Sequence, residues 1–182
     1  MSAPRPAPRR GRRSALLAPT AACLAAACLA ASAAQAQTRG CTRADTAAPP
    51  GQAIVCADGL TIRAERDSAF RLLDRDGDGR PDAARLDGRA LLVASPPRGG
   101  GFQILTPHAI AAVRGTVWAV DVAPGRTSVF VRRGRVAVRR PGGRSVTLGA
   151  GDGVDVEARS GPLAVTRWPP ERVSALLARF GR

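Results

Sequence analysis

TPHAIAAVRGT, residues 106–116, runs directly into VWAVDV, residues 117–122. In the second segment Trp118, Val120 and Val122 alternate with Val117, Ala119 and Asp121. A period of two is typical of a β-strand that buries one face against a core. We therefore expect a strand over residues 117–122, with its large apolar side chains on the same side.

The residues just before this strand predict a fixed corner. Gly115 permits a backbone conformation or a close approach that a Cβ would block. Arg114 offers a planar set of donors that can tie together several carbonyls or a carboxylate. Thr116 begins the strand with a hydroxyl that can cap the turn. We expect a structural, half-buried corner; a ligand or partner contact through Arg114 is the alternative.

Short alternating runs continue on both sides of this corner. From about residue 52 onward they are separated by turn residues, such as Asp58-Gly59, Asp87-Gly88 and Pro124-Gly125. Pro124-Gly125 suits a type II turn, since Pro presets one dihedral and Gly accepts the positive one. The spacing predicts an all-β domain. By itself it allows a jelly roll or a sandwich as well as other β architectures.

Three segments together resemble the FecR domain family. The first is the string T-P-x-A-x-x-x-V-R-G-T, with Thr106, Pro107, Val113, Arg114, Gly115 and Thr116 at its defined positions. A hairpin from Val131 to Val138 and a closing segment from Val146 to Asp152 follow in the family's order. The resemblance covers about residues 52–157. It implies a stacked-hairpin, solenoid-like β domain, which we place at residues 52–160.

The resemblance also implies a setting. In typical members a FecR domain lies in the periplasm and contacts a TonB-dependent outer-membrane receptor. A separate cytoplasmic domain passes the signal to an extracytoplasmic-function sigma factor. Here only 14 residues precede the first apolar segment, too few for that domain. We expect a stand-alone module whose partner is an envelope protein, either an outer-membrane receptor or a separately encoded signalling protein.

The amino end predicts export. Residues 1–14 hold five Arg and no acid, residues 15–34 are mainly Ala and Leu, and Ala34-Gln35-Ala36 supplies a small-x-small cleavage site. This is a tripartite signal peptide, residues 1–36, and it places the mature chain in the periplasm without a stable membrane span. Three alternatives stay open: an uncut membrane anchor, lipidation at Cys28, and twin-arginine rather than Sec export through Arg12-Arg13.

The cysteines predict one disulfide. Cys23 and Cys28 lie inside the signal, so only Cys41 and Cys56 remain in the mature chain. In an oxidising compartment that pair should be bonded. We expect it to tether an irregular arm, residues 37–51, to the first strand.

Net charge points to two kinds of partner. The whole chain carries +14, and removing five signal-peptide Arg leaves 14 − 5 = +9 on the mature chain. Such a surface attracts anionic polymers, although arginines on outward strand positions also simply cover apolar surface. The alternative function is thus a structural factor that binds anionic envelope polysaccharide or lipid. Nucleic acid is disfavoured by export and by the 3% aromatic content. The expected polymer-binding patch comprises Arg132, Arg133, Arg135, Arg139, Arg140 and Arg144.

An acidic loop predicts a cation site. Asp74, Asp76 and Asp78 alternate, the carbonyl of Arg80 follows, and Asp82 can close the shell. Oxygen ligands at this spacing resemble those of calcium loops. The EF-hand's closing Glu is missing, which favours a loop within a β-hairpin over residues 74–82. The other interpretation is an acidic surface turn neutralised by neighbouring arginines. We expect no organic cofactor.

The carboxyl end, residues 161–182, predicts a short helix. Pro169-Pro170 is followed by apolar residues at a spacing of i, i+3, i+4 and i+7: Val173, Leu176, Leu177 and Phe180. A helix this short is unstable alone, so we expect it to dock on the sheet near Trp168. Binding of a partner through this helix is an alternative.

The residue inventory does not predict an enzyme. His108 is the only histidine, so a Ser-His-Asp set lacks a second candidate base. Both mature cysteines are assigned to the disulfide, and carboxylates held on a cation are not free as acid and base. We expect a protein that acts by binding.

Overall fold

The computed structural model describes residues 40–97, 101–158 and 161–182. The segment expected to be a signal peptide, with its expected cleavage site, and part of the linker Pro96–Gly101 lie outside these ranges. The described residues form thirteen strands and one helix. In chain order the elements are β1 (Cys41–Ala47), β2 (Pro50–Cys56), β3 (Thr61–Glu65), β4 (Ala69–Leu73), β5 (Ala83–Ala94), β6 (Phe102–Leu105), β7 (Ile110–Val113), β8 (Val117–Ala123), β9 (Arg126–Arg133), β10 (Val136–Arg139), β11 (Ser145–Leu148), β12 (Asp152–Glu157), β13 (Val165–Arg167) and α1 (Pro170–Ala178).

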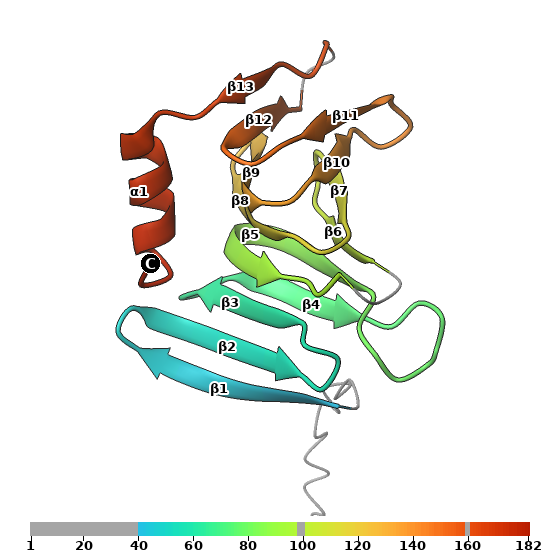
Figure 1. Ribbon diagram of the computed structural model, residues 1–182, viewed down its shortest axis with the longest axis vertical. Coiled ribbons are helices and arrows are strands. Elements are labelled where there is room, and N and C mark those ends of the chain that lie inside the picture. Colours follow the sequence, from blue (N-terminus) through green and yellow to red (C-terminus); the bar gives the residue numbers. More distant parts are fainter. Residues whose placement is uncertain (1–39, 98–100, 159–160) are drawn as a thin grey trace, which may run out of the picture. The chain divides into compact units, whose positions relative to one another are not determined.

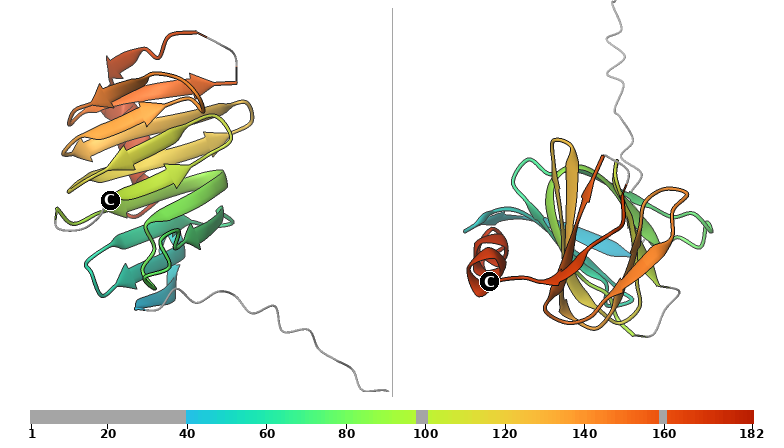
Figure 2. Two further views of the ribbon diagram at one scale, coloured as in Figure 1. Left: turned by 90° about the vertical axis from the view of Figure 1, so that its right-hand side faces the viewer. Right: turned by 90° about the horizontal axis from the view of Figure 1, so that it is seen from above.

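Backbone pairing connects all thirteen strands, and the long strand β5 belongs to both of the sheets into which they divide (Figure 1). Sheet A has the order β1-β2-β3-β5-β8-β9-β12-β13, and sheet B has the order β4-β5-β6-β7-β10-β11. All neighbours are antiparallel except β5 and β6. Successive hairpins stack on one another (Figure 2). The expected all-β, stacked-hairpin fold with a short carboxyl-terminal helix is confirmed.

Strand β5 passes from one sheet to the other at Gly88–Arg89. Its first half pairs with β4 and β6, and its second half, from Arg89, pairs with β8 and then β3. Arg89 has φ +66°, an uncommon value for a residue with a side chain. We expected Asp87-Gly88 to form a turn between strands. That prediction was wrong, because the backbone bends there without reversing and the strand continues in the other sheet.

The core lies between the two sheets. Trp118, Val120 and Val122 of β8 point into it, as their alternation predicts. They meet side chains such as Ile104 and Val136 from sheet B, all of them buried. Burial of this one continuous cluster supplies most of the driving force for folding.

The outer face of sheet A is covered by α1 (Figure 1). Leu176 and Phe180 of the carboxyl-terminal segment pack with Trp168 against Phe130 of β9. The rings of Trp168 and Phe130 are stacked with centroids 5.4 Å apart. Trp168 also lies over Gly153, where a Cβ would come within 2.2 Å of the indole Nε1. The docked helix expected from the spacing of apolar residues is therefore present.

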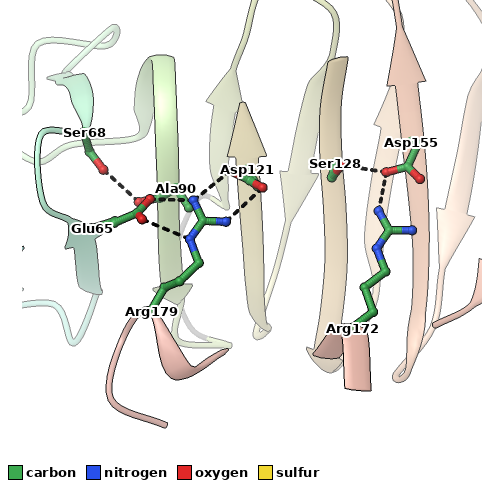
Figure 3. A network of polar contacts seen from close by, with 8 residues as sticks. All are labelled: Glu65, Ser68, Ala90, Asp121, Ser128, Asp155, Arg172 and Arg179. Carbon is green, nitrogen blue, oxygen red and sulfur yellow. Dashed lines mark hydrogen bonds and ion pairs between the residues drawn. The ribbon is translucent and has the colours of Figure 1, made fainter. Parts of the chain in front are cut away.

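Two arginines fasten this helical segment to sheet A (Figure 3). Arg179 donates to Glu65 of β3 at 3.1 Å from its Nε, and it pairs with Asp121 of β8 at 2.9 Å. Burial alone would lower the pKa of Arg179, but the hydrogen bonds to Asp121 and Glu65 outweigh it and raise the pKa. The guanidinium is thus held charged between two strands.

The second arginine, Arg172, binds Asp155 of β12 at 2.6 Å, and the hydroxyl of Ser128 donates to the same carboxylate. Burial favours the neutral acid, yet these two hydrogen bonds lower the pKa of Asp155 below its ordinary value. Arg172 also stacks on Trp168, with its guanidinium carbon 3.5 Å from the ring centroid. A cation over an indole ring is attracted by the ring's quadrupole.

The amino end of the domain is a hairpin rather than an arm. β1 pairs with β2 over its whole length, from Cys41 opposite Cys56 to Ala47 opposite Pro50. The expected irregular arm over residues 37–51 is corrected accordingly, because Ala48-Pro49 forms a tight turn that returns the chain along itself. The Cys41–Cys56 disulfide is confirmed and joins two directly opposed positions of the hairpin.

Candidate functional site

The family string forms two corners on either side of β7. In the first corner the hydroxyl of Thr106 donates to the carbonyl of Ala109 at 2.9 Å and accepts the N–H of the same residue at 2.9 Å. Thr106 is buried and also contacts the hydroxyl of Thr127 at 2.9 Å. These bonds close the turn between β6 and β7, while Pro107 stays exposed.

The second corner, Arg114-Gly115-Thr116, is held by Thr116. Its hydroxyl, which has one hydrogen to donate, lies within hydrogen-bonding distance of two carbonyls, that of Arg135 at 3.0 Å and that of Arg114 at 3.2 Å. Gly115 has φ +66°, and a Cβ there would lie 3.0 Å from Pro97. The corner is thereby joined to the turn between β9 and β10. The side chain of Arg114 is exposed and bonds to no described residue, so its guanidinium does not tie the corner together as we expected.

Arg114 instead lines a groove on the outer face of sheet B. The cavity volume is about 400 Å³. Four residues stand in register across its floor, in the order Gln103, Ala112, Ala137 and Thr147. The two alanines leave the middle of the floor low. The full lining is Arg75, Asp82, Gly101, Phe102, Gln103, Ala112, Val113, Arg114, Arg135, Ala137 and Thr147. We call this cavity the sheet-B groove.

Two arginines form one end of the sheet-B groove. Val113 pairs with Val136, so the next residues outward, Arg114 and Arg135, lie side by side. Both are exposed, and no ion pair joins either of them to a residue that the structure describes. Their positive charges are thus available to an incoming anionic group.

A third arginine on the groove wall is already neutralised. Arg75 pairs with Asp82 at 2.6 Å and donates to the side chain of Gln103 at 3.2 Å. The hydrogen bond that Arg75 donates to the carboxylate of Asp82 raises the pKa of Arg75. Partial burial works against ionisation of Asp82, but its bonds from Arg75 lower its pKa overall. Three arginines and one aspartate give the groove a net charge of 3 − 1 = +2.

The groove chemistry suits binding. Guanidinium groups hold carboxylates and phosphates through paired donors. Gln103 and Thr147 add an amide and a hydroxyl, and Ala112 and Ala137 leave room for a chain to lie close to the sheet. The lining residues include no histidine, cysteine or unpaired carboxylate that would act as a base or nucleophile.

The acidic loop between β4 and β5 brings together part of the expected cation site. Oxygens of Asp74, Asp76 and Asp78 lie within 4.8 Å of one another. Asp74 accepts the N–H groups of Gly77 and Gly79, both at 2.8 Å. Asp82 belongs instead to the Arg75 ion pair, so the structure does not place it with the other three carboxylates. A nearby guanidinium competes for this carboxylate, which the alternating spacing of aspartates did not reveal.

The expected polymer-binding patch is divided. Arg132, Arg133 and Arg135 lie at the turn that precedes β10, and the remaining three arginines lie at its other end. The intervening strand of four residues spans roughly 13 Å. Arg140 is also engaged, since it donates to the carbonyls of Gly161 at 2.8 Å and Glu157 at 3.5 Å. The six arginines thus gather at the two ends of β10.

Comparison with known proteins identifies the family. The family model described as "FecR protein" matches residues 42–137, which are just over half of the chain. This chain belongs to the FecR family. The matched range begins in β1 and ends in β10, so it contains both motif corners and the acidic loop but not α1.

Solved structures support the same fold for this FecR domain. Two crystal structures of a candidate anti-sigma factor from Parabacteroides distasonis each superpose with a TM-score of 0.58 at 18% sequence identity. The match covers 75% of this chain and 64% of that protein. At this identity the likeness concerns the fold alone. No curated protein sequence matches the chain.

Within residues 40–97, 101–158 and 161–182, no helix combines the length and apolarity that a bilayer crossing requires.

Sequence reasoning missed two features of this FecR domain. One is the sheet-B groove, which depends on four strands whose pairing is not local in sequence. The other is the pair Arg172 and Arg179, which hold α1 in place. Their spacing of seven residues puts them on one side of a helix, so this signal was present in the sequence.

Proposed function

We propose that this FecR domain is a non-catalytic binding module of the cell envelope, which acts in signalling by binding an acidic surface of a protein partner. The observation that carries the proposal is the sheet-B groove with its unneutralised Arg114 and Arg135. The outer face of sheet A is occupied by α1, whereas the groove face has no such cover among the described residues.

The signalling role rests on the family and on fold likeness. The chain belongs to the FecR family, and it shares a fold with a candidate anti-sigma factor. Since it spans 64% of the length of that protein, the activity of the longer protein does not transfer with the fold. A separately encoded signalling protein or an outer-membrane receptor is the partner class that we propose.

The proposed compartment is the periplasm. Residues 1–36 have the composition of an export signal, although they lie outside the described residues. The Cys41–Cys56 disulfide is consistent with this address, because such bonds persist in oxidising compartments.

An anionic envelope polymer is the alternative ligand. The high positive charge favours it, but the divided arginines and the engaged Arg140 weaken the case for a single polymer-binding surface. Polymer binding should decline steeply with ionic strength, whereas a shape-complementary protein interface should largely persist.

Affinity capture tests the proposal. Exported protein is used as bait in envelope extract at about 150 mM salt, and the washes are repeated at about 500 mM, where screening shortens the Debye length to a few ångströms. We expect a receptor or signalling protein to be enriched and to persist in the second wash. Recovery only of polysaccharide or lipid, removed by salt, would overturn the proposal and favour the alternative.

We also propose that the acidic loop binds calcium through Asp74, Asp76 and Asp78, which orders the loop beside the groove. The convergence of their oxygens favours this. Extracellular calcium modules bind with dissociation constants of roughly 0.1–1 mM, so about 10 mM calcium should stabilise the domain by roughly 1.4–2.7 kcal/mol.

A thermal melt with calcium and then with chelator checks this. We expect a rise in Tm of roughly 5 °C with calcium, and no rise for Asp76→Ala. Asp87→Ala, which removes an exposed carboxylate of β5 outside the loop, serves as the matched control. If the Tm of the wild-type protein is the same with calcium and with chelator, the proposal that the acidic loop binds calcium is contradicted.

A further inference from the structure

One sheet edge of this domain is unusually open. The described residues contain four edge strands: β1 and β13 in sheet A, and β4 and β11 in sheet B. β13 has three residues, β11 has four, and β4 is irregular at Ala69/Phe70. Short or bulged edges resist pairing with another chain. β1 has seven residues and pairs with β2 without a register shift, so its outer edge offers a regular ladder.

The hydrogen-bonding direction of β1 follows from two bonds at its end. The N–H of Ala57 donates to the carbonyl of Gly40 at 2.8 Å, whereas the N–H of Cys56 donates to the carbonyl of Leu60 at 2.9 Å, on the β3 side. Antiparallel ladders alternate residue by residue. Even-numbered residues of β1 therefore bond to β2. The N–H and C=O groups of Cys41, Arg43, Asp45 and Ala47 point to the free edge.

The sequence of this edge is self-complementary. The segment is symmetric about its central residue in Thr42-Arg43-Ala44-Asp45-Thr46. A threonine stands at each end, and a charged residue stands on each side of Ala44, positive on one side and negative on the other. If a second copy pairs antiparallel about a two-fold axis at Ala44, Arg43 stands opposite Asp45 of the partner subunit, and Thr42 opposite Thr46 of the partner subunit. Directly opposed residues lie on the same face and interact, and opposite charges and Thr–Thr pairs are favourable.

We propose that this protein forms a two-fold homodimer by antiparallel pairing of β1 with β1 of a second copy, which joins two A sheets into one. This register is consistent with the hydrogen-bonding pattern of β1. The backbone N–H and C=O groups of Arg43 and Asp45 face the free edge, so Arg43 and Asp45 of the partner subunit would exchange backbone hydrogen bonds. The two side chains are also available. Both are exposed, and no described residue forms an ion pair with either one.

A second copy fits this edge better than an unrelated strand. The edge presents one positive charge, Arg43, and one negative charge, Asp45. When its own antiparallel copy pairs with it, each of these charges faces the opposite charge of the partner subunit, so the seam contains two ion pairs, one on each side of the two-fold axis. Asp45 has only an exposed hydrogen bond from Gln52 at 3.3 Å, and Arg43 lies over the ring of Phe70 at 5.6 Å. The proposal is independent of the sheet-B groove.

The dimer should be weak and reversible. A seam of one seven-residue strand from each copy is small beside the ~1,200–2,000 Å² of standard interfaces. We expect a dissociation constant on the order of 100 µM.

Sedimentation equilibrium of the exported protein, over concentrations around that value, tests the dimer. Wild-type protein should shift from monomer to dimer. Asp45→Arg should weaken association by at least about tenfold, because it sets like charges opposite each other. Arg43→Asp should do the same. The double variant Arg43→Asp/Asp45→Arg should restore dimerisation.

Mixing the two single variants supplies a further readout. Each alone should remain monomeric, but the mixture should form a heterodimer, since every charge then faces its opposite. Thermal melts of the monomers establish that each variant is folded. A wild-type protein that stays monomeric to about ten times the expected constant would overturn the proposal. So would a dimer that is unaffected by Asp45→Arg.

Discussion

Trp168→Ala should lower the stability of the domain by about 3–5 kcal/mol, the range for removing a buried aromatic side chain. Trp168 is 6% exposed and lies between three groups: Phe130 stacked on its ring, Gly153 beneath its indole and Arg172 over its ring. The substitution opens a cavity and removes the cation–π contact at once. In a domain of this size Tm should fall by roughly 10 °C or more.

The loss should be concentrated in α1. A helix of nine residues is marginal by itself, so without Trp168 its remaining apolar contacts hold it less firmly. Hydrogen exchange should show reduced protection in residues 170–178 and smaller changes in β8. Val165→Ala, at a side chain that is 38% exposed on β13, is the control and should change stability by less than about 0.5 kcal/mol. A Tm for Trp168→Ala within about 2 °C of wild type would contradict the role given to this side chain.

Sequence patterns correctly predicted those elements that are determined by residues close to one another in the chain. The alternation of Trp118, Val120 and Val122 identified β8 and its buried face, and the spacing of Leu176 and Phe180 identified a docked helix. The family string supplied the fold. The disulfide followed from counting cysteines, because only Cys41 and Cys56 lie outside the segment that we expect to be a signal peptide.

Features that depend on distant residues were not predicted. The parallel pairing of β5 with β6 and the pairing of β7 with β10 create the groove, and neither has a local signature. Asp87-Gly88 has the composition of a turn, but its neighbours on both sides pair as strand and so it bends β5 instead. Asp82 is spaced like a cation ligand, and the guanidinium of Arg75 determines its contacts.

The second large effect is expected at the sheet-B groove. Arg114→Gln together with Arg135→Gln should weaken binding of the captured partner by about tenfold to a thousandfold, because each arginine contributes one charged hydrogen-bonding group. Both side chains are exposed and bond to no described residue, so the folded state should keep its stability. A change in Tm of less than about 2 °C is expected for the double variant.

A matched control removes the same charge elsewhere. Arg66 and Arg126 are exposed and lie outside the groove lining. The double variant Arg66→Gln/Arg126→Gln therefore has the same net charge as the groove variant. Comparison of the two separates a specific site from general attraction between a basic protein and an acidic partner.

The most direct test of the groove as the binding site is the dissociation constant of the captured partner for wild-type protein, the groove variant and the control variant, measured at one salt concentration. The account predicts that the groove variant binds at least about tenfold more weakly while the control stays within about threefold of wild type. Equal weakening of both variants, or no weakening by the groove variant, would contradict the claim that Arg114 and Arg135 form the partner site.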